Sequence, residues 1–401
     1  ILQQAGHRLL PRLFLRSEGF GSPAAEEQTR LYEAMGWIDY FVDVERLFLE
    51  ALTLLNVSER NRFSFGIARG SMGIGLISDF LSMFWLGGIY HRRAVALAAE
   101  IQHPLAIGLA DLGLAFHELH AVGHCDRALE LFRRSAAAYR EAGELRRWGA
   151  AATMVAWVLR FIGHPADSLE QSREILRVGQ EAGDPEVWGW GLAELGRSLL
   201  QAGALEDAAA HLQQAIELFK GIPDDLWVVF TMSDLAACML RQGRLKEAVH
   251  LLEESSRLSV RRGFKGYDRT QPRLPLAEAY LVAAEQAEQR DRAGWLRKTE
   301  RGCRVALRQG KVDAAAMPAA YRFQGTYEWL RGRPAAAQMW WQRSVKVAAT
   351  LGARYELGMT YLEMGKRLGA RADLLRAEAI LTDIGARWDL AQVREFLKKA
   401  S

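Results

Sequence analysis

Residues 194–219, ELGRSLLQAGALEDAAAHLQQAIELF, contain two amphipathic helical patterns separated by a glycine. On each side of Gly203, apolar residues recur every three or four positions, which places them on one face of a helix. A glycine suits the left-handed residue that ends a helix, so Gly203 predicts a tight reversal between two antiparallel helices. Neither helix can bury its apolar face alone. The segment therefore predicts a helical hairpin that stacks on similar neighbours.

The hairpin pattern repeats with a period of 40 residues. The predicted turn glycines at this spacing are Gly123, Gly163, Gly203 and Gly243. A small residue follows each of them by five positions, and small residues also precede the last three by seven, where the two helices must approach closely. The register returns at Gly325 and Gly332, and no stretch shows the alternation typical of strands. The sequence therefore predicts an all-α solenoid of antiparallel helical hairpins with about 40 residues per repeat.

The places where the repeat spacing is kept or broken predict how the chain is divided. Residues 263–275, GFKGYDRTQPRLP, interrupt the spacing with two prolines and two glycines, which favours an irregular loop or hinge. We expect one continuous solenoid, divided into an N-terminal linker or capping segment (1–23), repeats (24–261), the loop or hinge (262–275), further repeats (276–384) and a C-terminal capping helix (385–401).

Composition restricts the classes of partner. The 52 lysines and arginines nearly balance the 48 aspartates and glutamates, which leaves a net charge of +4. Such a small excess does not predict binding to nucleic acid or to an anionic membrane. Three widely separated cysteines are typical of a reducing cytoplasm. Residues 72–90 are strongly apolar but contain Asp79 and four glycines, so we expect a buried helix and not a membrane span.

Motifs for catalysis are missing from the sequence. It has no phosphate-binding loop, no zinc-protease or Ca²⁺-loop spacing and no nucleophile elbow, so we expect neither enzymatic activity nor a cofactor. His117, His120 and His124 could share one helix face and bind zinc. Because Gly123 is the predicted turn, His124 is expected to lie beyond the helix. A polar strip facing the groove is the favoured interpretation, with a metal site as the alternative.

The concave face of a stacked-hairpin solenoid is its usual binding surface, and we expect the first helix of each hairpin to line it. The repeat register places on this face His117, His120, Trp157, Arg160, Trp190, Arg197, Phe230, Ser233, Arg322 and Trp329. Arginine offers a forked donor and tryptophan a large rigid surface, which suits an acidic or aromatic peptide or a planar anionic small molecule. The alternative is that Trp157 and Trp190 belong to the core.

The segment 192–220 resembles a tetratricopeptide repeat. That family has a small residue in the first helix, a turn glycine, and then alanine, a bulky residue and alanine; the matching positions are Gly196, Gly203, Ala208, Leu212 and Ala215. The period of 40 is longer than the usual 34 of the family, which implies extended helices or linkers. The resemblance implies a right-handed superhelix.

The whole chain is also similar to the C-terminal helical region of large bacterial signalling ATPases of the STAND type. The phrases that carry this resemblance lie at 31–60, 351–369 and 377–394. It implies a non-catalytic sensor or interaction arm that binds a protein, a peptide or a small effector, with the ATPase and a cyclase, kinase or DNA-binding domain upstream of Ile1. The alternatives are a small-molecule receptor domain and a free-standing adaptor scaffold.

Overall fold

The computed structural model describes residues 44–222 and 224–399, together with residues 4, 7, 27–28, 31–32 and 35–36. Most of the predicted N-terminal segment 1–23 lies outside the described residues. All regular elements of the described residues are helical, which confirms the all-α prediction.

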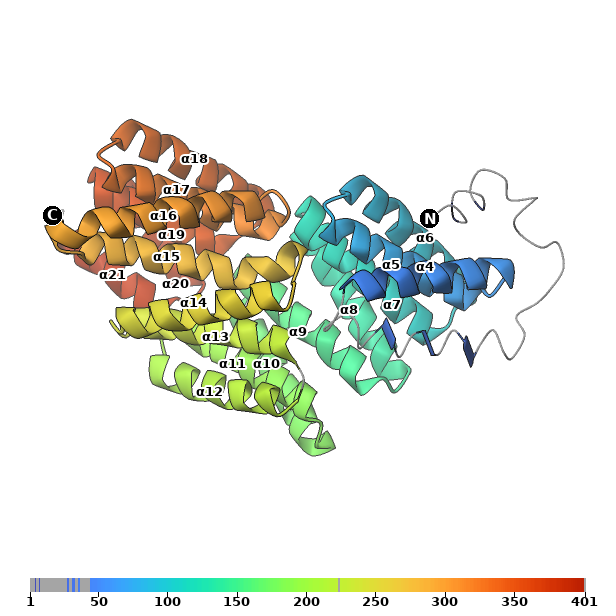
Figure 1. The fold of residues 1–401 in the computed structure, drawn as a ribbon. Coiled ribbons are helices and arrows are strands. Elements are labelled where there is room, and N and C mark those ends of the chain that lie inside the picture. Colours follow the sequence, from blue (N-terminus) through green and yellow to red (C-terminus); the bar gives the residue numbers. More distant parts are fainter. Residues whose placement is uncertain are drawn as a thin grey trace. The chain divides into compact units, whose positions relative to one another are not determined.

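The chain divides into two compact units (Figure 1). Unit 1 comprises residues 1–122, 126–151 and 262–265, and unit 2 comprises residues 123–125, 152–261 and 266–401. The helices that lie wholly or mostly in unit 1 are α4 (Val44–Arg60), α5 (Ser64–Phe80), α6 (Phe84–Ile101), α7 (Pro104–Phe116), the π-helical turn η1 (His117–Val122) and α8 (Cys125–Glu141). Helix α9 (Leu145–Ile162) contributes residues to both units.

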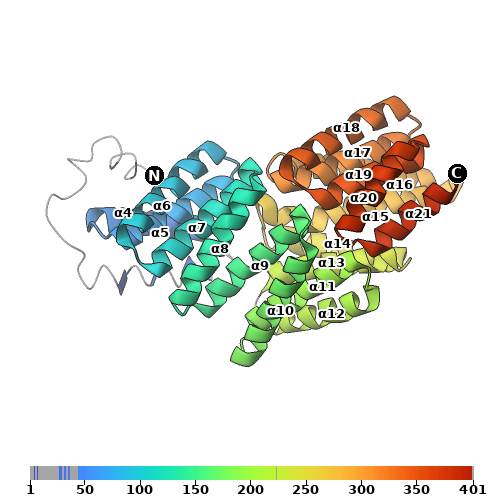
Figure 2. The ribbon, with the colours of Figure 1, turned by 180° about the vertical axis from the view of Figure 1, so that it is seen from behind.

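Unit 2 continues with paired helices. Its elements are α10 (Pro165–Ala182), α11 (Pro185–Ala202), α12 (Leu205–Gly221), α13 (Asp225–Arg241), α14 (Leu245–Arg261), the 3₁₀ turn η2 (Gly266–Arg269), α15 (Thr270–Gln286), α16 (Gln289–Gln309), the 3₁₀ turn η3 (Ala314–Ala316), α17 (Met317–Leu330), α18 (Pro334–Leu351), α19 (Arg354–Leu368), α20 (Arg371–Asp383) and α21 (Arg387–Lys399). Consecutive hairpins stack through α12 on α13, α14 on α15, α16 on α17 and α18 on α19 (Figures 1 and 2). Unit 2 is thus a superhelix of antiparallel helical hairpins.

Glycines with positive φ end the helices at the predicted turns and also between hairpins. Gly203, for example, has φ +84° and donates its backbone N–H to the Leu200 carbonyl, which ends α11. A second series lies midway between the predicted glycines, at Gly143, Gly183 and Gly263. The sequence pattern of 40 residues therefore consists of two turns that are about 20 residues apart.

Small residues allow the two helices of a hairpin to approach closely, as the repeat predicts. A Cβ on Gly196 would lie 2.6 Å from Cγ of Leu212 on the next helix, and one on Gly325 would lie 2.5 Å from the Trp341 ring. Ala208 is fully buried at the same contact. These positions explain why the register alternates small and bulky residues.

In unit 1 the glycine pair Gly87 and Gly88 does not form a turn, although adjacent glycines are a common turn signal. The chain reverses at residues 81–83, where Ser82 has φ +61°, and not at Gly87 and Gly88, which lie inside α6. These glycines follow from packing: a Cβ on Gly87 would stand 2.1 Å from an Asp79 carboxylate oxygen. A glycine pair therefore indicates close approach here instead of a turn.

One described helix, residues 104–122, is long and apolar enough to cross a membrane, and 56% of its most apolar window is buried inside the structure. The residues considered from the sequence, 72–90, form the end of α5, a turn and the start of α6. A helix of the protein core is buried in this way by the helices packed around it.

The irregular stretch is shorter than the sequence predicts. Helix α15 begins at Thr270, so 270–275 are helical although they include Pro272 and Pro275. Pro272 lies in the first turn, where the first four N–H groups have no intrahelical acceptor. Pro275 lies inside the helix and removes one intrahelical hydrogen bond. The non-helical connection is confined to residues near 263–265 and the turn η2.

The ionisation of Asp268 in η2 is expected to make the stability of the fold depend on pH. Burial, with a contribution from the nearby Asp313, raises the pKa of Asp268 to about 8. The unfolded chain releases this proton near pH ~3.9, so the folded state binds more protons between about pH 4 and 8. Stability is therefore expected to fall as the pH rises through this window.

Asp268→Asn is expected to remove this pH dependence. The variant should match the native chain in stability near pH 4 and exceed it at pH 8 by a few kcal/mol, since one pKa unit corresponds to about 1.4 kcal/mol. Urea-unfolding midpoints at both pH values measure the difference. An equal difference at both pH values would show that the effect does not come from ionisation of Asp268.

Candidate functional site: the inner ring of unit 2

The first helices of successive hairpins form the inner layer of unit 2. Helix α11 contacts α13, α13 contacts α15, α15 contacts α17, α17 contacts α19, and α19 contacts α21. The second helices, in the part of the chain that the structure describes, do not approach one another as closely. A layer whose members lie closer together is the concave layer of a bent stack. The first helices therefore line the concave side, as the sequence predicts.

The inner layer closes on itself, because α21 also contacts α11. We call α11, α13, α15, α17, α19 and α21 the inner ring, and the α11–α21 contact its seam. At the seam, a Cβ on Gly203 would lie 3.1 Å from the Trp388 backbone nitrogen. Close to it, a Cβ on Gly163 would lie 3.0 Å from Ile384 Cγ2. The turns at these glycines thus pack directly on the C-terminal hairpin.

Arginine–carboxylate pairs connect successive first helices. Arg160 of α9 donates to Glu194 of α11 at 2.8 Å, and Glu194 also pairs with Arg197 one turn along the same helix. Arg197 in turn donates through Nε to Asp234 of α13 at 2.6 Å. The guanidinium of Arg197 also lies over the Trp227 ring, 5.2 Å from its centroid. We call these pairs, with those described next, the charged network.

The network continues along the later helices. Arg322 of α17 pairs with Glu356 of α19 at 3.1 Å and with Glu278 of α15 at 3.5 Å. Arg367 of α19 pairs with Glu363 at 2.7 Å and with Glu285 of α15 at 2.9 Å. Each arginine named here thus pairs with a carboxylate on another first helix.

Arg241 of α13 joins both sides of the seam. It donates to the Leu200 carbonyl of α11 at 2.7 Å, to the Tyr355 hydroxyl of α19 at 2.5 Å and to Asp389 of α21 at 3.3 Å. Its guanidinium also lies 5.4 Å from the Trp388 ring centroid. One side chain therefore connects residues separated by up to 148 positions in the sequence.

The carboxylates of the charged network differ in the direction in which their pKa values are shifted. Burial would raise the pKa of Glu194, but the flanking Arg197 and Arg160 outweigh it and hold that pKa below its ordinary value. Burial does raise the pKa of Asp234, although Arg197 opposes it. Burial also raises the pKa of Glu278, which Arg322 lowers and Glu356 raises. Asp234 and Glu278 are therefore less well compensated by their arginine partners than Glu194 is.

The predicted groove residues lie in different environments. Arg160, Arg197 and Arg322 belong to the charged network, and Phe230 packs edge-on against Trp227 at 5.7 Å. The other predicted positions of unit 2 are half-buried or buried among aromatic or polar neighbours: Trp157 stacks on Phe161, Trp190 lies beside Trp227, Trp329 lies beside Trp341, and Ser233 donates to the Val229 carbonyl and faces Ser255.

Two of the predicted histidines, His117 and His120, lie on η1 in unit 1. His120 stacks on Phe116 with ring centroids 6.0 Å apart, while His117 is buried and hydrogen-bonds to Asp79. His124 lies in the exposed turn before α8, as the position of Gly123 predicts. The structure therefore does not bring the three histidines of the sequence pattern together in one described cluster.

Sequence reasoning missed the carboxylates of the network. Their signal is a spacing of about one repeat from the arginine or hydroxyl that they contact: 34 residues for Arg160–Glu194 and Arg322–Glu356, and 37 for Arg197–Asp234. A search for opposite charges 34 to 37 residues apart would have found these pairs.

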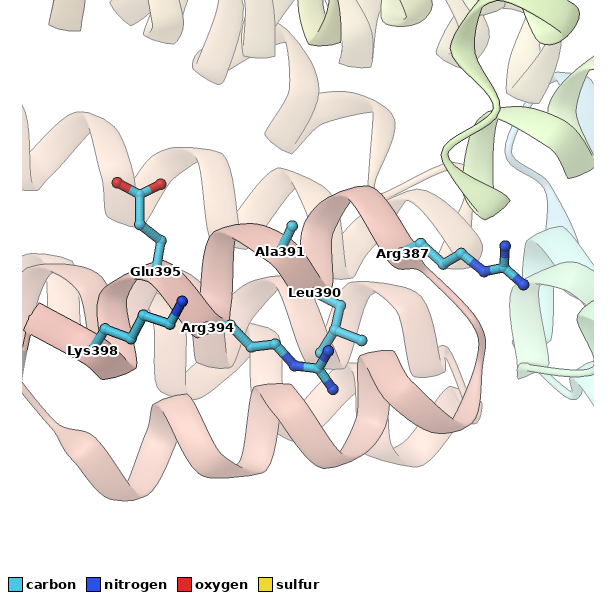
Figure 3. A pocket seen from close by; sticks show the side chains of 6 residues that line it. All are labelled: Arg387, Leu390, Ala391, Arg394, Glu395 and Lys398. Carbon is cyan, nitrogen blue, oxygen red and sulfur yellow. The ribbon is translucent and has the colours of Figure 1, made fainter.

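Helix α21 also borders a surface hollow, shown in Figure 3 with the side chains that line it. All of these side chains come from this one helix. Arg394 is paired with Glu378 and Glu395 with Lys399. A hollow lined by one helix, with these charges already matched, does not make a binding site.

Comparison with known proteins supports the repeat assignment. A family model described as tetratricopeptide repeat matches residues 190–259, which run from α11 to α14. The repeats are tetratricopeptide-like. No curated protein sequence matches the chain significantly.

Solved structures share the tetratricopeptide-like fold at low sequence identity. A Rap protein complexed with the competence and sporulation factor is 10% identical with a TM-score of 0.61, covering 94% of this chain and 99% of its own. NprR in complex with its cognate peptide NprX is 15% identical with a TM-score of 0.54, covering 87% and 92%. The apo form of the quorum sensor NprR from B. thuringiensis is 14% identical with a TM-score of 0.53, covering 80% and 87%.

Proposed function

We propose that the inner ring binds an extended peptide segment carrying a basic group, and that binding releases the seam. The charged network is the observation that carries this proposal. Buried ion pairs are weak stabilisers, and apolar residues of similar size would often hold the helices together as well or better. A concave layer that nevertheless keeps charged groups, several of them partly exposed, is suited to exchanging partners with a ligand.

The environment of Glu278 favours a basic ligand. The arginines of the network are already paired, so they offer less to an acidic ligand than their positions in the sequence suggest. Glu278 keeps 37% of its side chain exposed, pairs with Arg322 at 3.5 Å and has a raised pKa. An ammonium or guanidinium group placed there would compensate a carboxylate that its neighbours satisfy poorly.

Aromatic side chains next to the network suit a peptide. Trp227 and Phe230 are half-buried on α13, beside Arg197, and offer apolar area at a small entropic cost. The Rap and NprR structures of this fold include complexes with the competence and sporulation factor and with the peptide NprX. This likeness supports a peptide over a small molecule, which is the alternative ligand for the ring.

The mechanism we propose is a population shift. A ligand cation near Glu278 would compete with Arg241 for the carboxylates around it, and weaken the contacts of Arg241 with Tyr355 and Asp389. Because these contacts hold α21 against α11 and α13, their loss favours an open ring. The ring would then report ligand binding as a change in curvature.

We further propose that this sensor acts within a larger protein, as the arm of a signalling ATPase. The support is the resemblance of 31–60, 351–369 and 377–394 to such arms. Its test is nucleotide hydrolysis by the full-length protein with and without a ring-binding peptide. Hydrolysis that does not respond to a peptide of proven affinity would contradict this role and leave the ring site itself intact.

Glu278→Gln is expected to weaken the binding of peptides selected by the native chain from a random peptide library. These peptides should be rich in lysine or arginine, and their affinity should fall at least about tenfold, because a hydrogen bond to a charged group contributes about 1.5–3 kcal/mol. Fluorescence anisotropy with labelled peptides measures the affinity. Glu247→Gln is the matched control, because Glu247 forms an exposed pair with Arg244 on a second helix.

Hydrogen exchange of α21 supplies the second measurement. Exchange in 387–399 should increase when the peptide binds. Selected peptides without basic residues, or equal affinity for the native and Glu278→Gln chains, would contradict the proposal. Saturable binding of a metabolite with no peptide selected would favour a small-molecule receptor.

A further inference from the structure

A buried cluster in unit 1 joins three helical elements through one carboxylate. Asp79 of α5 contacts His91 Nε2 of α6 through Oδ2 at 3.0 Å. It contacts His117 Nδ1 of η1 through Oδ1, also at 3.0 Å. All three side chains are buried, and one potential ligand atom from each lies within 4.8 Å of the others. The cluster lies in unit 1, apart from the residues of the inner ring.

The surrounding backbone leaves room for these side chains. A Cβ on Gly87 would stand 2.1 Å from Asp79 Oδ1, and one on Gly75 would stand 2.7 Å from the His91 ring. Glycine inside a helix costs about 0.5–1 kcal/mol relative to alanine. His117 begins the π-helical turn η1, and such turns are frequent at functional sites. Glycines inside helices and a π-helical turn are both locally unfavourable, and here they allow the three side chains to lie together.

The three side chains are all groups that bind cations. Asp79 offers a carboxylate, and His91 and His117 each offer an imidazole nitrogen, the donors that divalent transition metals take in proteins. Asp79 lies on α5, His91 on α6 and His117 on η1, so each ligand is held by a different helical element.

We propose that Asp79, His91 and His117 bind one divalent transition-metal ion, with Zn²⁺ the best match to two imidazole nitrogens and a carboxylate. Zinc lies about 2.0–2.1 Å from each ligand atom, so two ligand atoms are at most about 4.2 Å apart. The carboxylate–imidazole distances of 3.0 Å meet this limit, and a small inward shift of one imidazole brings the whole group within it.

Binding requires each imidazole to present a lone pair to the ion. Each neutral ring does so by carrying its proton on the other ring nitrogen, so no proton is released from a neutral ring. Three protein ligands leave a fourth position for water. The ion would tie α5, α6 and η1 together, and its role is structural.

The test uses the full chain without a histidine tag, stripped with a chelator and titrated with ZnCl₂ by calorimetry. One equivalent of zinc is expected to bind and to raise the melting temperature, since only the folded chain assembles the site. Co²⁺ in place of Zn²⁺ should give the visible bands of a low-symmetry site. His117→Gln should weaken zinc binding about 100-fold or more, while His120→Gln, on the same turn but outside the cluster, should leave it unchanged.

The native chain alone can overturn the proposal. Folded native protein that binds neither Zn²⁺ nor Co²⁺ stoichiometrically would refute it, even if His117→Gln failed to fold. Equal zinc affinity in the native and His117→Gln chains would also refute it. Circular dichroism of both variants establishes that each is folded when its affinity is compared.

Discussion

Arg241→Ala is expected to lower the free energy of unfolding of unit 2 by about 3–5 kcal/mol, because it leaves a buried carboxylate without its cation. Asp389 has only 1% of its side chain exposed, and Arg241 is its ion-pair partner across the seam. The same substitution removes the hydrogen bonds to the Leu200 carbonyl and to Tyr355. Hydrogen exchange of α21 and chemical denaturation of the full chain measure the loss.

The controls separate charge from general packing. Arg244→Ala removes an exposed arginine that lies just before α14 and pairs with Glu247 three residues later, and stability should stay unchanged within error. The double variant Arg241→Met with Asp389→Leu should recover most of the stability, because an apolar pair replaces a buried ion pair well. An Arg241→Ala chain as stable as the native one, with α21 equally protected, would show that Arg241 does not hold the ring closed.

Gly191→Ala is expected to destabilise unit 2 by about 3 kcal/mol, at the upper end of the usual range for overpacking. A Cβ on Gly191 of α11 would lie 2.4 Å from the backbone N and Cα of Leu176 on α10. A Cβ on Gly179 of α10 would lie at the same distance from the Trp188 backbone nitrogen, so the two helices pack backbone to backbone. A flexible side chain could move aside, but here two helix backbones must separate.

Gly294→Ala is the matched control, because it makes the same chemical change in the middle of α16. A Cβ there would meet nothing within 4 Å. The variant should gain roughly 0.5–1 kcal/mol, since alanine has the higher helix propensity. Denaturation midpoints of the two variants should therefore move in opposite directions. A shift of the same sign in both would show that the close contact at Leu176 does not determine the effect of Gly191→Ala.

The sequence predicts the hairpins well because their causes are local. Gly203 ends α11 where the periodicity indicates, and Gly196 and Ala208 lie at the close contact that small residues imply. The same local reasoning fails where a glycine is required by side chains that pack against it from other helices. Gly87 and Gly88 resemble a turn in the sequence, yet they lie inside α6 because the Asp79 and His117 side chains approach them.

The candidate site could be predicted only in part. The register places Arg160, Arg197 and Arg322 on the first helices, since side-chain direction follows from helical phase. It does not reveal that their carboxylate partners lie on other helices, because contacts between hairpins depend on how the stack bends. The sequence suggested an acidic or aromatic ligand from the arginines and tryptophans. We propose a basic ligand because these arginines are paired with carboxylates.

By itself, the sequence determined the helical hairpins, their turns and the face of each helix that packs inward, since helix periodicity and glycine conformation act within one repeat. Tertiary structure alone decided that α21 meets α11, that Arg241 joins them, and that Asp79, His91 and His117 converge. The side-chain hydrogen bonds of Arg241 and of this cluster link residues 12 to 148 positions apart. Whether such distant helices meet depends on the sum of the small rotations between successive repeats. The sequence of one repeat does not determine that sum.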